Sequence, residues 1–155
     1  MNLDSYQAAA ENRAKHRIAS RIFNDSLAHA NILVDAMLRH ARIDEDLYIY
    51  SGSLPQGTYH HLLTCQARSI HILVDDASHL DWLLKASDRP KLEVFQIKQP
   101  RINHFLLTTG GFFRFEKDKS KFDAEANFNE PSVCAVLLAA FQRYLIDASP
   151  VEMNA

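Results

Sequence analysis

The side chains best suited to chemistry stand between residues 101 and 131, where the sequence is RINHFLLTTGGFFRFEKDKSKFDAEANFNEP. His104 begins one apolar run. In the next run Arg114 and Glu116 alternate with phenylalanines, so they share one face of a predicted strand. Two interpretations fit this pattern. Either Arg114 binds an anion in a pocket that also holds His104, or the charged side chains form a solvated or cross-strand paired face on a hairpin at the edge of a sheet.

Two amides downstream belong to the same candidate site. Asn127 and Asn129 precede the last predicted helix, and we expect them to cap and brace the loop that enters it. In the alternative interpretation, their amides order His104 or Arg114. The site predicted from this stretch therefore consists of His104, Arg114, Glu116 and the two asparagines.

A second set of polar side chains follows the first predicted strand. In an open α/β sheet, ligands bind beyond the carboxyl ends of the strands. This rule selects Ser51 and Ser53, then Tyr59 and His60 at the start of a helix. Hydroxyl groups and free backbone amides at a helix N-terminus can bind an anion. The simpler interpretation is a turn followed by a helix cap, and both interpretations stay open.

The eight histidines do not have the spacing of a metal site. The sequence lacks HxxxH, HExxH and Cys-x-x-Cys patterns, and the consecutive His60 and His61 diverge by about 100° in a helix. Asp75 and Asp76 are adjacent, but no second acidic cluster with matching spacing accompanies them. We therefore predict no metal and no cofactor. A P-loop, a GxGxxG fingerprint and a GxSxG motif are also absent, which argues against the commonest nucleotide-binding and serine-hydrolase sites.

Composition predicts a single globular domain spanning residues 1–155. Hydrophobic residues make up 47% and charged residues 23%, and the net charge of −2 argues against a strongly electrostatic nucleic-acid binder. Cys65 and Cys134 lie in apolar contexts and are predicted to be buried thiols of a reducing compartment. No apolar run is long enough for a membrane span, and the polar N-terminus lacks a signal core. We expect a cytoplasmic protein.

The elements that must position these side chains alternate between helix and strand. Gly110-Gly111 predicts a hairpin between HFLLTT and FFRFE. The last predicted helix, from Pro131 to about Asp147, is apolar nearly all round, so it is expected to be buried in the core or at a subunit interface. The other predicted elements are a helical arm within 1–25, helices over 27–41, from 58 and over 78–87, strands over 47–53, 69–76 and 91–99, and a flexible tail over 149–155.

This order of elements predicts an α/β fold. We expect a mostly parallel sheet flanked by helices on both faces, with a C-terminal β-hairpin added as an antiparallel edge and a final buried helix. The pattern resembles the phospholipase D-like superfamily over roughly residues 27–145. The resemblance rests on the element order, on His104 at the start of the hairpin and on the polar loop that follows.

Active members of that superfamily carry a His-x-Lys motif on the hairpin strand, an Asp near the turn and a Gly-Ser-x-Asn segment downstream. The resemblance implies that His104 would attack a phosphodiester and that single-repeat members work as homodimers. Here Leu106 stands where the lysine is expected, Gly111 stands where the Asp is expected, and no Gly-Ser-x-Asn segment follows. Because leucine cannot stabilise a developing charge, the resemblance implies a degenerate member that has lost hydrolysis.

Three functions are consistent with these observations. The first is a non-catalytic binding or regulatory protein that acts through a protein partner or a small anionic ligand, of the kind found among bacterial and phage accessory factors. The second is a homodimeric phosphodiesterase or nuclease that uses His104 from each subunit. The third, ranked last, is a nucleic-acid-binding module that uses Lys117, Lys119 and Lys121 with Phe122. The last helix and the edge of the hairpin are the candidate dimer surfaces.

Overall fold

The computed structural model describes residues 2–86 and 91–152. Its elements follow the chain in this order: α1 (Leu3–His16), β1 (Ile22–Asn24), α2 (Leu27–His40), β2 (Asp46–Ser51), α3 (Gln56–Tyr59), the 3₁₀ helix η1 (His60–Leu63), β3 (Ser69–Val74), α4 (Asp81–Ala86), β4 (Leu92–Ile97), β5 (His104–Thr108), β6 (Phe113–Glu116), β7 (Ala124–Asn127), α5 (Pro131–Leu145) and β8 (Ala148–Pro150). The predicted hairpin is the β5–β6 pair, and the predicted last helix is α5.

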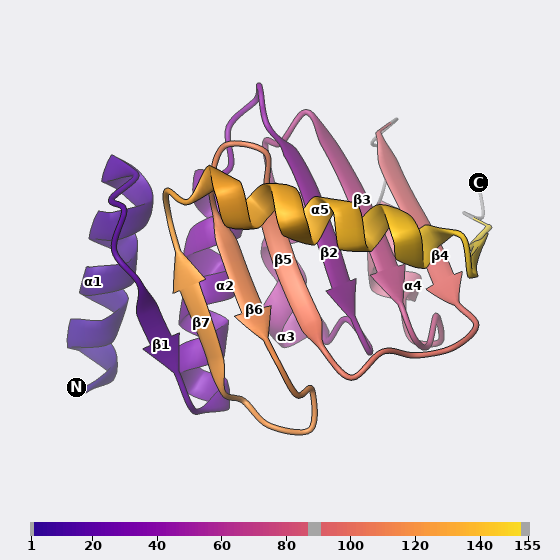
Figure 1. The fold of residues 1–155 in the computed structure, drawn as a ribbon, viewed down its shortest axis with the longest axis horizontal. Coiled ribbons are helices and arrows are strands. Elements are labelled where there is room, and N and C mark those ends of the chain that lie inside the picture. The colour runs from indigo at the N-terminus through magenta and orange to yellow at the C-terminus, as the bar shows by residue number, and fades with distance from the viewer. Residues whose placement is uncertain (1, 87–90, 153–155) are drawn as a thin grey trace.

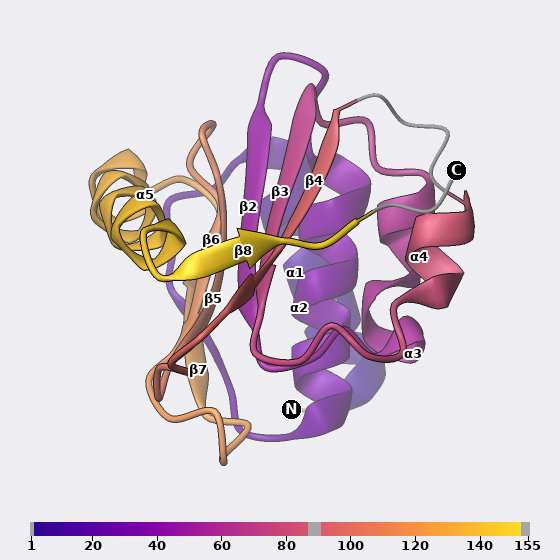
Figure 2. The same ribbon diagram turned by 90° about the vertical axis from the view of Figure 1, so that its right-hand side faces the viewer.

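One eight-stranded sheet forms the centre of the molecule, with strand order β1-β7-β6-β5-β2-β3-β4-β8. Helix α5 crosses one face of the sheet, and α1 to α4 lie on the other (Figures 1 and 2). The predicted α/β class with helices on both faces is confirmed. The sheet is mixed rather than mostly parallel, because only the β2–β3 and β3–β4 pairs are parallel and the other five pairs are antiparallel.

The β5–β6 hairpin lies inside the sheet, whereas the sequence predicted it at an edge. Strand β6 pairs with β7, and β7 pairs with β1, so two further strands cover it. The sequence analysis placed residues 124–127 in a loop and residues 22–24 at the end of a helical arm. Strands of three or four residues carry little sequence signal, because pairing with a neighbour and not local propensity holds them.

The N-terminal helix packs on the body of the protein, which was one of the two arrangements open for the N-terminal helical arm. Tyr6, Ala10 and Ala14 of α1 are buried against α2 and its neighbours. The Tyr6 hydroxyl donates a hydrogen bond to the carbonyl oxygen of Phe23 over 2.7 Å. The apolar face of α1 is small in the sequence because two of its three buried residues are alanines. Small side chains nevertheless allow two helices to approach closely.

The chain after α5 is also ordered further than predicted. Ser149 and Pro150, which we expected in a flexible tail, belong to β8 and pair with β4. The backbone N–H of Val151 then donates to the carbonyl oxygen of Val94 over 2.8 Å. Residues 153–155 of the predicted tail lie outside the described residues.

Helix α5 is buried on one side only. Cys134, Leu137 and Phe141 face a cluster of sheet residues that includes Phe105 and Phe113. The opposite side is exposed, and Val136 is 67% accessible to solvent. Burial in the core is therefore wrong for the outer face of this helix, and burial at a subunit interface stays a prediction.

Two apolar clusters fill the two sides of the sheet, one against α1 to α4 and one against α5. Cys65 and Cys134 are both buried and form no disulfide, as predicted. Within residues 2–86 and 91–152, the structure contains no helix with the length and apolar character that crossing a bilayer requires.

Candidate functional site

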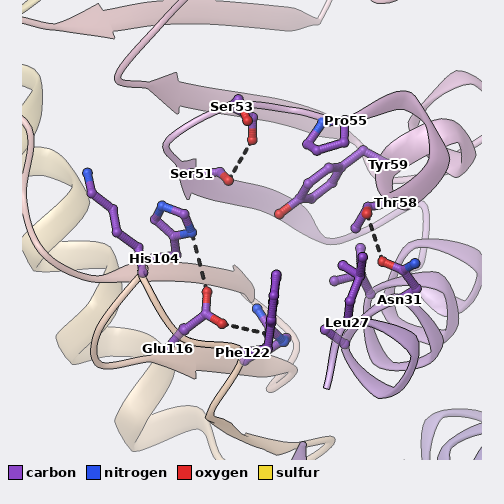
Figure 3. Close-up of a pocket in the computed structure, with 14 residues that line it drawn as sticks. Leu27, Asn31, Ser51, Ser53, Pro55, Thr58, Tyr59, His104, Glu116 and Phe122 are labelled. Carbon is purple, nitrogen blue, oxygen red and sulfur yellow. Dashed lines mark hydrogen bonds and ion pairs between the residues drawn. The ribbon is translucent and has the colours of Figure 1, made fainter. Parts of the chain in front are cut away.

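A pocket of about 370 Å³ opens where β2 ends, between the sheet and helices α2 and α3 (Figure 3). Topology explains why the polar residues meet there. Strand β5 runs antiparallel to β2 and so begins at that end, and β6 runs back to the same end. The pocket brings together six residues that the sequence selected as candidates: Ser51, Ser53, Tyr59, His104, Arg114 and Glu116.

His104 is held on both of its ring nitrogens. Its Nε2 accepts a hydrogen bond from the backbone N–H of Gly52 over 2.8 Å, and its Nδ1 lies 3.4 Å from Oε2 of Glu116. Because a backbone N–H can only donate, Nε2 must offer its lone pair, and the ring proton therefore sits on Nδ1 facing the carboxylate. A Cβ atom on Gly52 would lie 3.2 Å from Nε2, so the glycine permits this close approach.

Arg114 and Glu116 are buried beside His104, with exposed fractions of 6% and 4%. On β6 their side chains point toward α2, whereas the neighbouring phenylalanines pack on the α5 side. Nε of Arg114 donates to Oδ1 of Asn24 over 3.1 Å, and Nη2 lies 3.4 Å from Oε1 of Glu116. A solvated face on an edge hairpin is therefore wrong, whereas the cross-strand pairing of that alternative is present between His104 and Glu116. The interpretation as a pocket also fits the geometry.

Lys119 also lines the pocket, and Asn24 accepts a hydrogen bond from Arg114 without being part of the lining; neither residue was expected in this site from the sequence. Asn24 lies on the short strand β1, whose existence was missed. Lys119 comes from the loop between β6 and β7, and its Nζ contacts the carboxylate of Asp75. The Tyr50 hydroxyl donates to the same carboxylate over 2.7 Å. Burial raises the pKa of Tyr50, and the bond to Asp75 raises it further, so this hydroxyl stays protonated.

The opposite wall is mostly apolar and comes from α2 and the segment after β2. Leu27, Val34 and Phe122 contribute carbon surface, and Tyr59 is buried. Burial raises the pKa of Tyr59, so it too is a neutral phenol. On this wall the Thr58 hydroxyl donates to Oδ1 of Asn31 over 2.7 Å (Figure 3). The pocket thus combines one charged side with one largely apolar side.

Asn127 and Asn129 lie away from the pocket. Strand β7 runs antiparallel to β6, so Asn127 pairs with Phe113 at the far end of the strand from Glu116. Nδ2 of Asn127 donates to Oε2 of Glu130 over 2.9 Å, and its Oδ1 accepts from the backbone N–H of Asn129 over 3.1 Å. These contacts fit the expectation that the asparagines brace the entry to α5, and the alternative that they order His104 or Arg114 is wrong.

His60 also lies outside the pocket lining. It is exposed at the start of η1, next to His61 and near Asp35 of α2. Among the described residues, this group has donor atoms close enough together to hold a metal ion. The described residues that line the pocket include no comparable group of metal ligands.

The predicted basic patch is interrupted in the structure. Lys117 and Lys121 are exposed, but Lys119 between them turns inward to the carboxylate of Asp75. Phe122 is 49% exposed and its backbone oxygen accepts a hydrogen bond from Asn24. This arrangement leaves a broken charged surface and weakens the case for a nucleic-acid interface.

No protein-family model and no curated protein matches this chain. Two solved structures are similar in fold. Nuc, a phospholipase D family member from Salmonella typhimurium, is 12% identical with a TM-score of 0.66, over 87% of this chain and 99% of Nuc. TrmBL2, an archaeal chromatin protein with a novel mode of DNA binding, is 16% identical with a TM-score of 0.61, over 96% of this chain and 62% of TrmBL2. At these identities the likeness establishes the fold alone.

Proposed function

We propose, from the premise that the chain has a phospholipase D-like fold, that it is a non-catalytic binding protein whose pocket takes a small anionic ligand. The observation that carries this proposal is the state of His104. Its Nε2 lone pair is already used by the backbone N–H of Gly52. An imidazole in this state can position a neighbouring group or donate from Nδ1, but it has no free lone pair for attack on a substrate.

The surroundings of His104 support the same conclusion. Leu106 stands two residues further along β5, on the same face of the strand, and is only 3% exposed within the apolar cluster beside α2. A phosphoryl-transfer site needs cations aimed at the transferring group, because their contribution to the rate is several kcal/mol each. In this pocket, Lys119 is neutralised by Asp75, which leaves Arg114 as the principal cation.

Arg114 is suited to hold an anion. Its Nε and Nη2 have protein partners, whereas its Nη1 makes no hydrogen bond within residues 2–86 and 91–152. A guanidinium binds phosphate or carboxylate through two parallel hydrogen bonds. The apolar side of the pocket favours a ligand that joins such an anionic head to a compact apolar body. We therefore assign the class of small organic phosphates and carboxylates.

A calorimetric titration with phenyl phosphate tests this assignment. Arg114→Met should weaken binding about 10- to 100-fold, since it removes a hydrogen bond to a charged group. The matched control is Arg68→Met, because Arg68 pairs with Asp46 at an exposed position away from the pocket. Equal affinity in both variants, with circular dichroism showing an intact fold, would overturn the anion site.

One observation favours a second function, a homodimeric phosphodiesterase or nuclease. The contact between Nδ1 of His104 and Glu116 would orient the ring if substrate binding displaced the Gly52 amide. Hydrolysis of bis-p-nitrophenyl phosphate and of single- and double-stranded DNA discriminates the two functions. Turnover by the wild type that disappears in His104→Ala would establish the enzyme, whereas no turnover in either protein keeps the binding protein.

A homodimer is part of this proposal, with the outer face of α5 as its contact surface. Ala135, Val136 and Ala139 are exposed there, while the β5–β6 hairpin is enclosed within the sheet. Light scattering at micromolar concentration should give a dimer, and Val136→Glu should give a monomer. A wild-type monomer would remove both the dimer and the two-subunit enzyme. A cytoplasmic accessory role, bacterial or phage, stays a prediction from the sequence.

A further inference from the structure

Helix α2 and the segment α3–η1 bring three metal-ligating side chains together outside the pocket. They are Asp35, His60 and His61, and one donor atom from each lies within 4.8 Å of the other two. Nε2 of His61 lies 3.2 Å from Oδ1 of Asp35. Zinc bonds to nitrogen and oxygen of about 2.0–2.2 Å place tetrahedral ligand atoms about 3.3 Å apart, so this pair already has the required spacing.

The sequence argument against a metal here assumed that consecutive histidines diverge around a helix. The structure shows the His60 and His61 rings 4.1 Å apart between centroids and inclined by 38°. The chain passes from α-helix to 3₁₀ helix at this point, and the long imidazole side chains turn toward each other. The divergence of consecutive residues around a helix therefore did not predict where the two imidazole rings lie.

The second ring nitrogen of His60 supplies an independent observation. Nδ1 of His60 lies 3.3 Å from the carbonyl oxygen of Gly57. Because a carbonyl can only accept, Nδ1 carries the proton and the Nε2 lone pair is available. Histidines that bind metals usually donate their other N–H to a carbonyl or a carboxylate, and this contact fixes the tautomer.

We propose that Asp35, His60 and His61 form a binding site for a divalent transition-metal ion of the zinc class. Two imidazoles and one carboxylate supply three ligands, and water completes the tetrahedron. His60 is exposed, so its ring can move the short distance that closes the site. His61 and Asp35 are partly buried, with side-chain exposures of 25% and 30%, and they give the site a firm base.

The ion would join two elements that form a wall of the pocket. Thr58 and Tyr59 line the pocket and immediately precede the two histidine ligands. Asn31, which bonds to Thr58, lies one helical turn before Asp35 on α2. Bound metal therefore cross-links α2 to the segment α3–η1 and stiffens this wall. The site is independent of the anion-binding function, and its test does not require a pocket ligand.

Competition for Zn²⁺ with a chromophoric chelator, using the full chain, measures the site. We expect one ion per chain. Asp35→Asn, His60→Ala and His61→Ala should each weaken binding by at least about 10-fold, since loss of even a supporting contact costs about 10- to 100-fold. His16→Ala is the matched control, because His16 is an exposed histidine outside the group, and it should bind Zn²⁺ as the wild type does.

Hydrogen exchange with and without Zn²⁺ gives a second readout that adventitious binding would not produce. The backbone amides of residues 56–63 should exchange more slowly when the ion is bound, and those of α5 should not change. Zn²⁺ affinity that is the same in the wild type and in His60→Ala would overturn the site. His60→Ala removes an exposed side chain, so misfolding cannot account for its result. Protection that does not include residues 56–63 would also overturn it.

Discussion

The pair Arg17–Glu45 lies beneath the Gly110–Gly111 turn, and the pair Arg114–Glu116 lies beside the pocket at the other end of the sheet. Both pairs are buried: the side-chain exposures are 12% and 5% in the first and 7% and 5% in the second. A buried charge is tolerated only where partners replace the water it has lost. The two pairs meet this condition to different degrees.

The pair Arg17–Glu45 has its partners on all sides. Nη1 of Arg17 donates to Oε2 of Glu45 over 2.9 Å, and Nη2 donates to the carbonyl oxygen of His40 over 2.8 Å. The backbone N–H of Arg42 donates to Oε1 of Glu45 over 2.9 Å. The guanidinium also lies over the Phe112 ring, 3.8 Å from its centroid. This pair connects α1, the start of β2 and the hairpin through direct contacts.

The pair Arg114–Glu116 is held more loosely. Its closest contact is 3.4 Å, and its remaining partners are the side chains of Asn24 and His104. Within the described ranges, no main-chain donor or acceptor bonds to either side chain. The difference teaches that an Arg–Glu pair stabilises the fold where main-chain groups fill its hydrogen-bonding positions. Where such a pair faces a pocket, it keeps hydrogen-bonding capacity for a ligand.

The largest expected effect comes from removing the negative charge of each pair. Glu45→Gln should lower the free energy of unfolding by about 3 kcal/mol, because Arg17 is left as an uncompensated buried charge. Glu116→Gln should cost about 1 kcal/mol, because water in the pocket can reach Arg114. Urea unfolding of both variants measures the difference. Equal losses would contradict the distinction between the two pairs.

A methyl group at Gly110 sharpens the comparison without changing a charge. A Cβ atom there would lie 1.9 Å from Oε2 of Glu45 and 2.4 Å from its Cδ. Because Arg17 holds that carboxylate in place, Gly110→Ala should lower the free energy of unfolding by about 2 kcal/mol.

Gly57→Ala is the control for this change, because nothing lies within 4 Å of its added Cβ. It should leave stability unchanged or raise it by about 0.5 kcal/mol through a stiffer unfolded chain. Thermal unfolding of both variants measures the contrast. An unaffected Gly110→Ala protein would mean that Glu45 is free to move.

The smallest expected effect is a difference in acid sensitivity. Burial acts to raise the pKa of Glu45, but hydrogen bonds from Arg17 and Thr108 outweigh it and hold the pKa below its usual value. Since the folded pKa is depressed, the carboxylate stabilises the fold above the unfolded pKa of about 4.3, and this contribution is lost as pH falls through the folded pKa.

Unfolding measured from pH 6 to pH 3 checks this difference. The wild type should lose more stability than Glu45→Gln over that range, so the two curves should converge toward acid. Asp46, whose pKa the guanidinium of Arg68 lowers to about 2, is present in both proteins and cancels in the comparison. Parallel curves would show that Glu45 does not titrate with folding.

The sequence predicted neither ion pair, but it placed Arg114 and Glu116 on one face of a strand. Arg114 and Glu116 alternate with phenylalanines on a clear strand, so periodicity marked them as neighbours on one face. Arg17 and Glu45 are 28 residues apart in polar stretches, and only the tertiary fold joins them. The same limit explains Lys119, which lines the pocket from a loop, and Asn24, which bonds to Arg114 from a short strand.

The class of the fold was predictable because long elements carry strong periodic signals. The positions of Ser51, Ser53 and Tyr59 followed from the rule on strand ends, and His104 was selected from the hairpin pattern. Strands β1, β7 and β8 were missed because three or four residues contain too little of any period. Missing β7 and β1 led directly to the misplacement of the hairpin at an edge, because these two strands extend the sheet beyond β6.

The two outermost strands, β1 and β8, have three residues each. A sheet that ended in β7 or β4 would expose a longer row of unpaired backbone groups, which is a template for strand addition and fibre growth. β8 also carries Pro150, which has no N–H to offer an incoming strand. The short end strands therefore disfavour aggregation through strand addition at the edges of the sheet. Any association of copies is then expected to use the helical faces.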